Sequence, residues 1–466
     1  METENDQQIE ELGSRTRLYL ATLSVNFLYV SAGSTQAWTS PTLPKLVNIL
    51  TPDEASLVGS LYSFGAAFGP IIGALCLNSL GRKGTLYVLG GCFLISWIIL
   101  APTYNVYVLY VGRFIGGIGV GGTLSCAAMY LAEVADKKSR GPINSINHTS
   151  LALGCLIEYA VGPWTSYLTL ILVSGLSAIL FFITFFFIPE SFYYLLIKER
   201  KQEAIESLRW FRGNISEISV QKELNEIQES IRIRQENKDG WKTMLQRGPL
   251  ISLCICFYLL TIEQGSGNTA IVGFAQLIFE EAHVAVSGAM IPIIGSVAIF
   301  FAGLLSPFIV NRFSMKIAFI FSSFGVAFAL GLMAIFFYLD SIGKAVPAVS
   351  FLPVLGFVLY KVFFCWGCGP LPWAITAELF PLKVKGLATS LCGIYYSLIG
   401  FAVIELTGIY LNRSGPTLVF TGLFFFLTIT TAAVIFILPD TTGLSLQEVH
   451  DYMQSGKRPQ KSDVKT

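Results

Sequence analysis

The sequence predicts an all-α membrane protein, with twelve transmembrane helices in two pseudo-symmetric six-helix bundles. Three observations support this fold class. Hydrophobic residues make up 53% of the 466 residues and charged residues 13%, against roughly 25% charged residues in a soluble domain. Twelve apolar segments are long enough to span a bilayer. The two halves of the chain also carry the same short motifs in the same order.

The apolar segments follow one another along the chain with one long polar interval between the sixth and the seventh. A helix needs about 20 apolar residues to cross the hydrocarbon core. The segments lie near residues 18–38, 56–77, 85–101, 106–131, 145–163, 166–188, 250–279, 285–310, 317–339, 347–376, 387–411 and 416–438. We therefore expect an N-terminal bundle in 1–189, a cytosolic linker in 190–248, a C-terminal bundle in 249–439 and a cytosolic tail in 440–466.

Lysine and arginine are concentrated in the loops of one predicted side of the membrane. If both termini are cytosolic, 26 of the 31 basic residues lie on the cytosolic side, and only Lys45, Lys344 and Arg413 lie outside. This asymmetry follows the positive-inside rule and sets the predicted orientation. The bases are dispersed among many loops and the net charge is +1, so nucleic-acid binding is not expected. We expect an integral protein of the plasma membrane.

Three marks recur in each half of the chain. The first is an asparagine followed five residues later by a lysine, the second an acid followed seven residues later by a base and glycine, and the third a proline–acid–hydroxyl triplet. They lie at 78–83, 133–141 and 189–191 in the first half and at 311–316, 378–386 and 439–441 in the second. Repeats of this kind are how many transporters build alternating access around a site at the repeat interface.

The charged members of these marks form two candidate networks at the cytosolic rim. Bases and acids placed there can pair in one conformation and separate in another. An exposed pair contributes only about 0–1 kcal/mol, but several pairs together can bias a two-state equilibrium. The alternative, that the bases only set topology, leaves the acids unexplained. The candidates are Arg82, Lys83, Glu133, Arg140 and Glu190 in the first half and Arg312, Lys316, Glu378, Lys385 and Asp440 in the second.

The polar linker contains two stretches with apolar residues at helical spacing, residues 198–211 and 220–235. Gly213 is well placed to end the first of them. We expect two short amphipathic helices that cover the cytosolic face, with partner binding as the less favoured alternative.

A break is predicted in the tenth apolar segment, where residues 367–373 read Gly-Cys-Gly-Pro-Leu-Pro-Trp. A broken helix at membrane depth is tolerated only where it lines a cavity or is buried in protein. Trp373 is therefore a candidate to stack on a ligand, although a tryptophan can equally be part of the core. The nine cysteines lie in or beside apolar segments, and Cys365 and Cys368 lack a second ligand pair, so no metal site is expected.

With these motifs the chain resembles the sugar porters of the major facilitator superfamily. The matching motifs lie at residues 81–83, 112–116, 130–141, 189–191, 369–381 and 439–443. Residues 37–46, Ala-Trp-Thr-Ser-Pro-Thr-Leu-Pro-Lys-Leu, most resemble the insect facilitated trehalose transporters. The resemblance implies the major facilitator fold and a pathway between two bundles, with sugar hydroxyls bound by polar side chains near the membrane centre.

Carried over position by position, the resemblance implies a set of substrate-binding residues. They are His148, Glu263, Gln264, Asn268, Thr269, Trp373 and Tyr396. Several depart from the family pattern: His148 and Glu263 stand where the family has glutamines, and Tyr396 replaces an asparagine. His148 could bind sugar hydroxyls or pack as a satisfied polar residue, and both interpretations stay open. These departures leave the identity of the sugar open.

Two opposite charges fall near the middle of predicted spans, Glu263 and Lys361. A charge at the centre of a spanning helix costs about 2.5–3.5 kcal/mol. An opposite charge about 4 Å away would return roughly 4 kcal/mol at an effective dielectric near 20. We expect either a static pair or a coupling pair in which Glu263 takes up a proton. Glu158 and Glu405 are expected to reach water at the outer ends of their spans.

These inferences lead to a sugar transporter of the trehalose or hexose class that works by alternating access. Facilitated diffusion is expected because the first span offers Ser34 and Thr35 but no acid. The alternatives are a proton-coupled symporter that uses Glu263 and a non-transporting sugar receptor. No nucleophile–base pair or metal cluster indicates an enzyme, and no cofactor is expected. The implied partners are a small sugar and the lipid bilayer.

Overall fold

The computed structural model describes the chain in ten stretches. These are residues 15–101, 103–136, 138–213, 216–236, 240–280, 286–310, 313–344, 349–380, 384–439 and 448. By contacts the chain divides into two compact units, which follow the predicted halves with two exceptions. Residues 36–64 and 159–164 belong to the first half of the sequence but group with the second.

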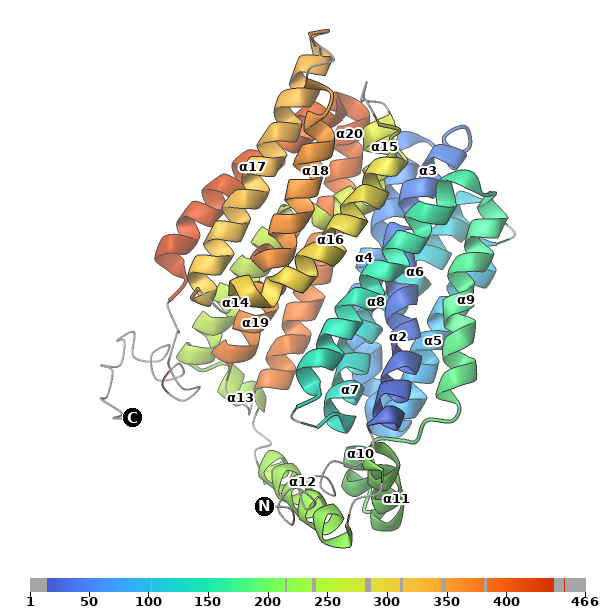
Figure 1. The fold of residues 1–466 in the computed structure, drawn as a ribbon, viewed down its shortest axis with the longest axis vertical. Helices are drawn as coiled ribbons and strands as arrows, with labels where there is room; N and C mark the ends of the chain where they lie inside the picture. The colour runs from blue at the N-terminus through green and yellow to red at the C-terminus, as the bar shows by residue number, and fades with distance from the viewer. Residues whose placement is uncertain are drawn as a thin grey trace, which may run out of the picture. The chain divides into compact units, whose positions relative to one another are not determined.

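The first unit is built from the helices of the first half and of the linker (Figure 1). The helices of the first half that contribute to it are α2 (Thr16–Ala37), α4 (Pro52–Ser79), α5 (Gly81–Leu100), α6 (Val106–Gly122), η1 (Thr123–Ala127), α7 (Ala128–Val134), α8 (Arg140–Val161) and α9 (Tyr167–Phe185). Glycines allow these helices to approach closely: a side chain at Gly121 on α6 would collide with the backbone of Ala66 on α4. Likewise, Gly33 on α2 faces the backbone of Leu151 on α8. Small residues at such crossings are typical of membrane helices.

The second unit contains the helices of the second half together with the short helix α3 (Thr39–Leu46). Its other helices are α14 (Arg247–Gly265), α15 (Asn268–Glu280), α16 (Met290–Val310), α17 (Met315–Ser341), α18 (Leu352–Phe363), η4 (Phe364–Cys368), α19 (Pro370–Leu379) and α20 (Lys385–Ile437). In α20 the last two predicted segments are joined across a kink at Gly415, whose φ is 73°. Glycine adopts this conformation readily, and Pro416 follows it.

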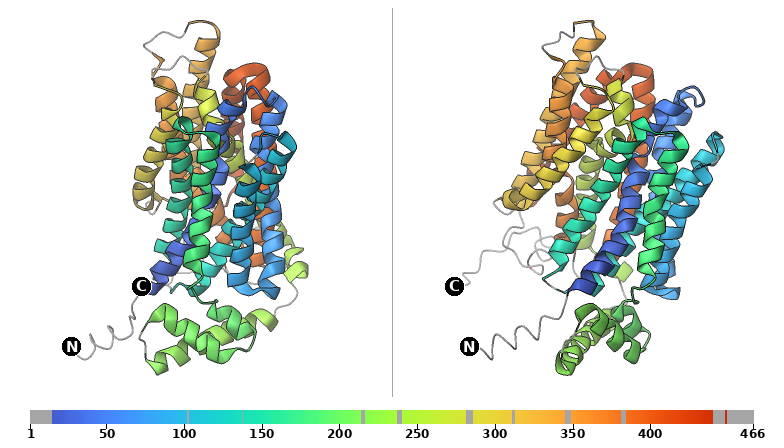
Figure 2. Two further views of the ribbon diagram at one scale, coloured as in Figure 1. Left: turned by 90° about the vertical axis from the view of Figure 1, so that its right-hand side faces the viewer. Right: turned by 45° about the vertical axis from the view of Figure 1, so that its right-hand side comes forward.

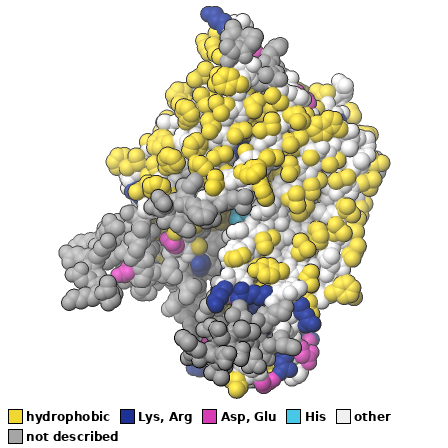
Figure 3. All heavy atoms as spheres, viewed as in Figure 1, with side chains coloured by type: hydrophobic (Ala, Val, Ile, Leu, Met, Phe, Trp, Pro, Cys, Tyr) yellow, Lys and Arg dark blue, Asp and Glu magenta, His cyan; other side chains and the backbone are white. Residues whose placement is uncertain are grey.

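Each of the twelve predicted apolar segments coincides with helix in the described residues. Within these residues, eight helical stretches are long and apolar enough to cross a membrane. Figure 3 shows hydrophobic side chains over most of the helices of the visible face. On α9 and just after it, Leu172, Phe186 and Phe187 are 64%, 70% and 73% exposed. Such an apolar outer surface is what a lipid environment requires.

Two of the predicted spans are interrupted. The seventh divides into α14 and α15 at Ser266 and Gly267, and Gly267 has φ 82°. The tenth contains the π-helical turn η4 directly before Pro370, so the break predicted for residues 367–373 is confirmed and begins slightly earlier. A second π-helical turn, η1, lies in the fourth span and was not predicted from the sequence. Turns of this kind are often found at functional sites.

The linker forms the helices α10 (Phe192–Ile197), α11 (Lys201–Arg212), α12 (Glu217–Glu236) and α13 (Gly240–Met244). The two predicted amphipathic helices correspond to α11 and α12, and Gly213 ends α11 with φ 76°. Figure 2 shows α10–α12, in green, together beside the ends of the helices of the first unit. Arg212 fastens them there, because its Nη1 donates to the carbonyl of Val134, 2.7 Å away.

Candidate functional site

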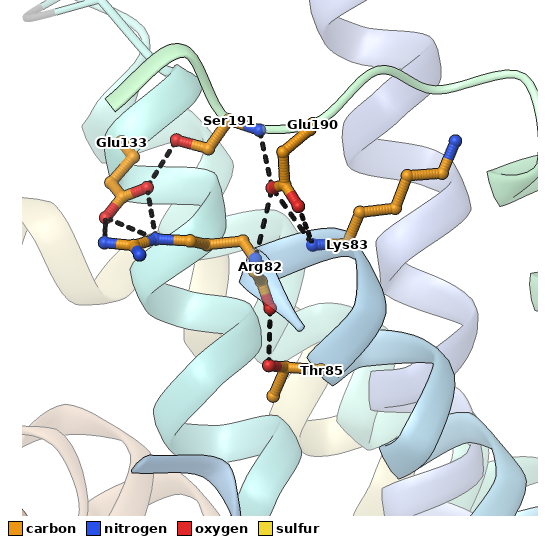
Figure 4. Close-up of polar contacts among 7 residues, drawn as sticks. Arg82, Lys83, Thr85, Glu133, Glu190 and Ser191 are labelled. Atoms are coloured by element: carbon orange, nitrogen blue, oxygen red, sulfur yellow. Dashed lines mark hydrogen bonds and ion pairs between the residues drawn. The ribbon is translucent and has the colours of Figure 1, made fainter. Parts of the chain in front are cut away.

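The charge network of the first half is assembled around Arg82 at the start of α5 (Figure 4). Its guanidinium holds the Glu133 carboxylate of α7 in a forked arrangement, with Nη2–Oε1 at 2.8 Å and Nε within 3.1 Å of both oxygens. Ser191 donates its hydroxyl to the same carboxylate. Arg82 is only 8% exposed, so the pair is desolvated and its geometry is of the strong, charge-assisted kind.

Glu190 completes this network by capping the N-terminus of α5. Its carboxylate accepts the backbone N–H groups of Arg82 and Lys83, at 3.0–3.2 Å, and that of Ser191 at 2.7 Å. An anion at this end of a helix is stabilised by the unpaired N–H groups and the helix dipole. Burial raises the pKa of the Glu190 carboxyl, and the hydrogen bonds from the Ser191 and Lys83 backbone oppose this rise.

Glycine at position 81 is what allows Glu190 to come so close. Gly81 has φ 79°, and a β-carbon there would collide with the Glu190 carboxylate. The sequence motif Gly-Arg-Lys therefore has a geometric reason for its first residue. Tyr130 supports the same corner from α7, because its hydroxyl donates to the carbonyl of Pro189 at 2.9 Å. Arg140, also predicted in this network, begins α8 with an exposed side chain.

The second half reproduces part of this arrangement. Lys316 Nζ donates to the carbonyl of Ile435 at 2.8 Å, as Lys83 Nζ does to that of Phe186 at 3.0 Å. Met315 occupies the position that corresponds to Arg82, so the forked pair cannot be repeated. Glu378 and Lys385 lie near the end of α19 and at the start of α20, both half-buried. Arg312 and Asp440 lie outside the described residues.

Four of the predicted substrate-binding residues meet where α14 breaks into α15. Gln264 accepts the hydroxyl of Thr269 at 2.6 Å and donates to the backbone carbonyl of Tyr396 at 3.2 Å. The ring of Tyr396 meets that of Trp373 edge to face, with centroids 5.3 Å apart. The break itself is stabilised by Ser266, whose hydroxyl donates to the carbonyl of Glu263 at 2.6 Å.

Glu263 lies beside this aromatic pair. The side chains of Tyr396 and Trp373 are both within hydrogen-bonding reach of its carboxyl group. Glu263 is 4% exposed, and its Oε2 is buried without a hydrogen-bond partner. A buried carboxylate with an unsatisfied oxygen is costly and needs a functional or structural explanation.

Lys361, the other predicted intramembrane charge, is engaged with Asn268. Its Nζ donates to Asn268 Oδ1 at 2.9 Å and lies 5.3 and 5.5 Å from the ring centroids of Phe357 and Tyr360. Among the described residues, no ion pair joins Lys361 to Glu263. Asn268 and Lys361 thus form one pair, and Glu263 forms a separate cluster with Trp373 and Tyr396.

His148 belongs to the first unit, on α8. Its side chain is exposed and lies on a polar helix face with Asn144, Ser145 and Thr149, which are also exposed. Residues at spacings of three and four share a face of a helix. A polar face on a membrane helix requires water or polar partners rather than lipid. The side chain of His148 is therefore exposed in the structure and is not part of a packed core.

A set of contacts between first-half helices and the second half, all within the second unit, was not predicted from the sequence. Ser60 donates to Glu405 Oε2 at 2.5 Å, and Ser40 accepts the backbone N–H of Gln276 at 3.0 Å. Ser63 donates to the carbonyl of Ser397 at 2.9 Å. The sequence feature that could have indicated these contacts is in the second apolar segment, where Ser56, Ser60 and Ser63 recur at helical spacing in an otherwise apolar stretch.

One expectation for an intramembrane acid was wrong. Glu158 does not reach water, because it is fully buried and accepts the hydroxyl of Ser174 on α9 at 2.5 Å. Glu405 is half-buried and accepts the hydroxyl of Ser60.

Comparison with known proteins is informative along nearly the whole chain. The family model described as sugar (and other) transporter matches residues 21–452. The facilitated trehalose transporter Tret1 of Drosophila mojavensis is 29% identical over 94% of this chain and 52% of that protein. The Tret1 of Apis mellifera ligustica is 28% identical over 93% of this chain and 88% of that protein. This chain spans about half the length of several of the Tret1 proteins that it matches, among them that of Drosophila mojavensis.

Solved structures show the same fold. The inward-open xylose transporter XylE from E. coli has a TM-score of 0.80 and 21% identity, covering 93% of this chain and 99% of that chain. A partially occluded inward-open form of XylE gives a TM-score of 0.79 with 20% identity, covering 92% of this chain and all of that one. At this identity the likeness concerns the fold alone.

Proposed function

Because this chain belongs to the family of sugar (and other) transporters, we propose that it carries a sugar of the trehalose or hexose class across the plasma membrane. The chain has the major facilitator fold, with membrane-spanning helices from two homologous halves. Transport proceeds by alternating access and involves no covalent chemistry. Both termini lie in the cytosol, on the side of the Arg82–Glu133 network.

The observation that carries this proposal is the polar and aromatic cluster at the broken seventh span. Gln264, Thr269, Tyr396 and Trp373 combine hydrogen-bonding groups with aromatic rings around an interruption in α14–α15. An irregular backbone at membrane depth is expected where a helix lines a binding cavity. Amide, hydroxyl and aromatic groups are the side chains that suit sugar hydroxyls and ring faces.

Facilitated diffusion is the proposed mode of transport. The first spanning helix, α2, contains serines and threonines but no acidic residue. Its hydroxyl groups are held by hydrogen bonds within the protein, such as Thr35 Oγ1 to the carbonyl of Ser31 at 2.8 Å and Ser31 to Ser177 on α9 at 2.7 Å. This helix therefore offers no carboxylate to carry a proton.

Uptake of radiolabelled trehalose and glucose into proteoliposomes tests this proposal, with and without an inward proton gradient. We expect saturable uptake of at least one of the two sugars, at a rate that the gradient does not change. Uptake that needs the gradient would overturn the facilitator mechanism. Binding without uptake or counterflow would support a sugar receptor instead.

A further inference from the structure

A carboxylate beside two aromatic rings distinguishes the cluster at the broken seventh span. Glu263 is only 4% exposed. The rings of Trp373 and Tyr396 cross at 69° with their centroids 5.3 Å apart, and both side chains reach the Glu263 carboxyl. Trp373 and Tyr396 are themselves only half-buried, so part of each side chain is accessible.

The carboxyl group of Glu263 has no charged partner among the described protein groups around it. Among the described residues, no lysine or arginine forms an ion pair with it, and Lys361 donates to Asn268 instead. The groups that approach Glu263 are a phenol and an indole, which are neutral donors. Oε2 has no hydrogen bond at all. A buried carboxyl group without a charged partner takes up a proton, whereas a cationic donor at Oε2 would keep it ionised.

We propose that Glu263 gives the transport site a preference for sugars that carry a protonated amino group. This inference rests on the proposed function and specifies its substrate class. The ammonium group donates to Oε2 of Glu263 and lies against the faces of Trp373 and Tyr396. A carboxylate gives charge-assisted hydrogen bonds to such a group, and aromatic faces attract cations, with tryptophan the best of them.

The chemistry of the carboxylate explains why an amino group is favoured over a hydroxyl at the same position. An ionised carboxylate only accepts hydrogen bonds, and an ammonium group only donates them. A hydroxyl also satisfies Oε2, but without a charge to balance that of Glu263. An acetylated amine keeps one N–H donor and loses the charge, so it separates the contribution of charge from that of hydrogen bonding.

Competition between matched sugars measures this preference. Glucosamine is compared with glucose and N-acetylglucosamine, and 2-amino-2-deoxytrehalose with trehalose, as inhibitors of labelled-sugar uptake at a pH where the amine is charged. The same ratios are measured for Glu263→Gln, which removes the charge with little change of shape, and for Glu263→Asp, which keeps it. Glu226→Gln on the exposed face of α12 is the control for a lost acid.

We expect the charged amine of at least one pair to compete about tenfold or more better than its neutral counterpart. Glu263→Gln should abolish that ratio, whereas Glu263→Asp and Glu226→Gln should keep most of it. A ratio near one in the unaltered protein overturns the inference even if Glu263→Gln fails to fold. If neutral sugars are taken up while the ratio is near one, only the preference for amino sugars is overturned and the proposed function stands. Absence of uptake and of binding for every sugar, from folded protein, overturns both.

Discussion

At the scale of the residue, Arg82 and Glu133 show how two short sequence motifs come together to form a buried ion pair. Arg82 is placed by the turn at Gly81, and Glu133 by the end of α7. Their side chains are about nine-tenths buried, at 10% and 11% exposure. Breaking one partner of a buried pair leaves an uncompensated charge and costs about 3–5 kcal/mol.

We therefore predict that Glu133→Gln lowers the stability of the protein by an amount of that order. The amide cannot balance the charge of Arg82 and also weakens the hydrogen bond from Ser191. The thermal unfolding midpoint in detergent measures the effect, with Glu226→Gln as the matched control. A midpoint equal to that of the control would show that the Arg82–Glu133 pair contributes nothing to stability.

Sequence reasoning at this scale identified residue types better than their partners. Trp373, Tyr396 and Gln264 were expected at one site and do meet. Glu263 and Lys361 were weighed as a pair because they carry opposite charges, but Lys361 donates to Asn268. Whether Lys361 meets Glu263 or Asn268 depends on the rotation of α18 about its axis relative to the α14–α15 break. Apolar segments fix the length of a membrane helix and leave its rotation undetermined.

At the scale of the element, helix breaks carry most of the information about the site. The prolines and glycines of residues 367–373 predicted the interruption of the tenth span, because proline cannot continue the hydrogen-bonding of a helix. The break at Gly267 and the π-helical turn η1 were not predicted. A single glycine in an apolar run is compatible with an unbroken helix, and only the packing of the folded chain decides between the two.

We predict that Gly267→Ala weakens both stability and transport. Gly267 has φ 82°, and a β-carbon there would lie 2.7 Å from Leu423 Cδ1. The strained backbone costs about 1 kcal/mol or more and shifts the α14–α15 break that holds Gln264. Unfolding midpoint and initial uptake rate measure the two effects.

Gly422→Ala is the matched control for this substitution. Gly422 lies within the helix α20, and a β-carbon there would meet nothing within 4 Å. Alanine should stabilise such a helix by up to about 1 kcal/mol. If Gly267→Ala behaved like Gly422→Ala, the conformation at the break would not matter for the site.

At the scale of the whole molecule, the grouping of helices into two units concerns the contacts that must change when the protein transports its substrate. The sequence predicted two halves with matching motifs, and the corresponding contacts of Lys83 and Lys316 agree with that symmetry. The sequence did not indicate that residues 36–64 and 159–164 would group with the second half. Each conformation of a transporter has its own contacts between halves, and one sequence encodes all of them.

Alternating access requires the contacts between residues 36–64 and the second half to separate once in every transport cycle. A cysteine pair at Thr39 and Gly273 tests it, because a β-carbon at Gly273 would lie 3.1 Å from Thr39 Oγ1. This spacing suits a disulfide between α3 and α15. The Thr39→Cys, Gly273→Cys protein is compared with each single variant, since the chain has nine native cysteines, which are free in the structure.

Sugar uptake by this double variant, measured before oxidation, after oxidation and after renewed reduction, is the most direct test of the account. We predict that oxidation abolishes uptake by the double variant, that reduction restores it, and that the single variants are unaffected. Undiminished uptake by protein shown to be fully cross-linked would contradict transport by alternating access.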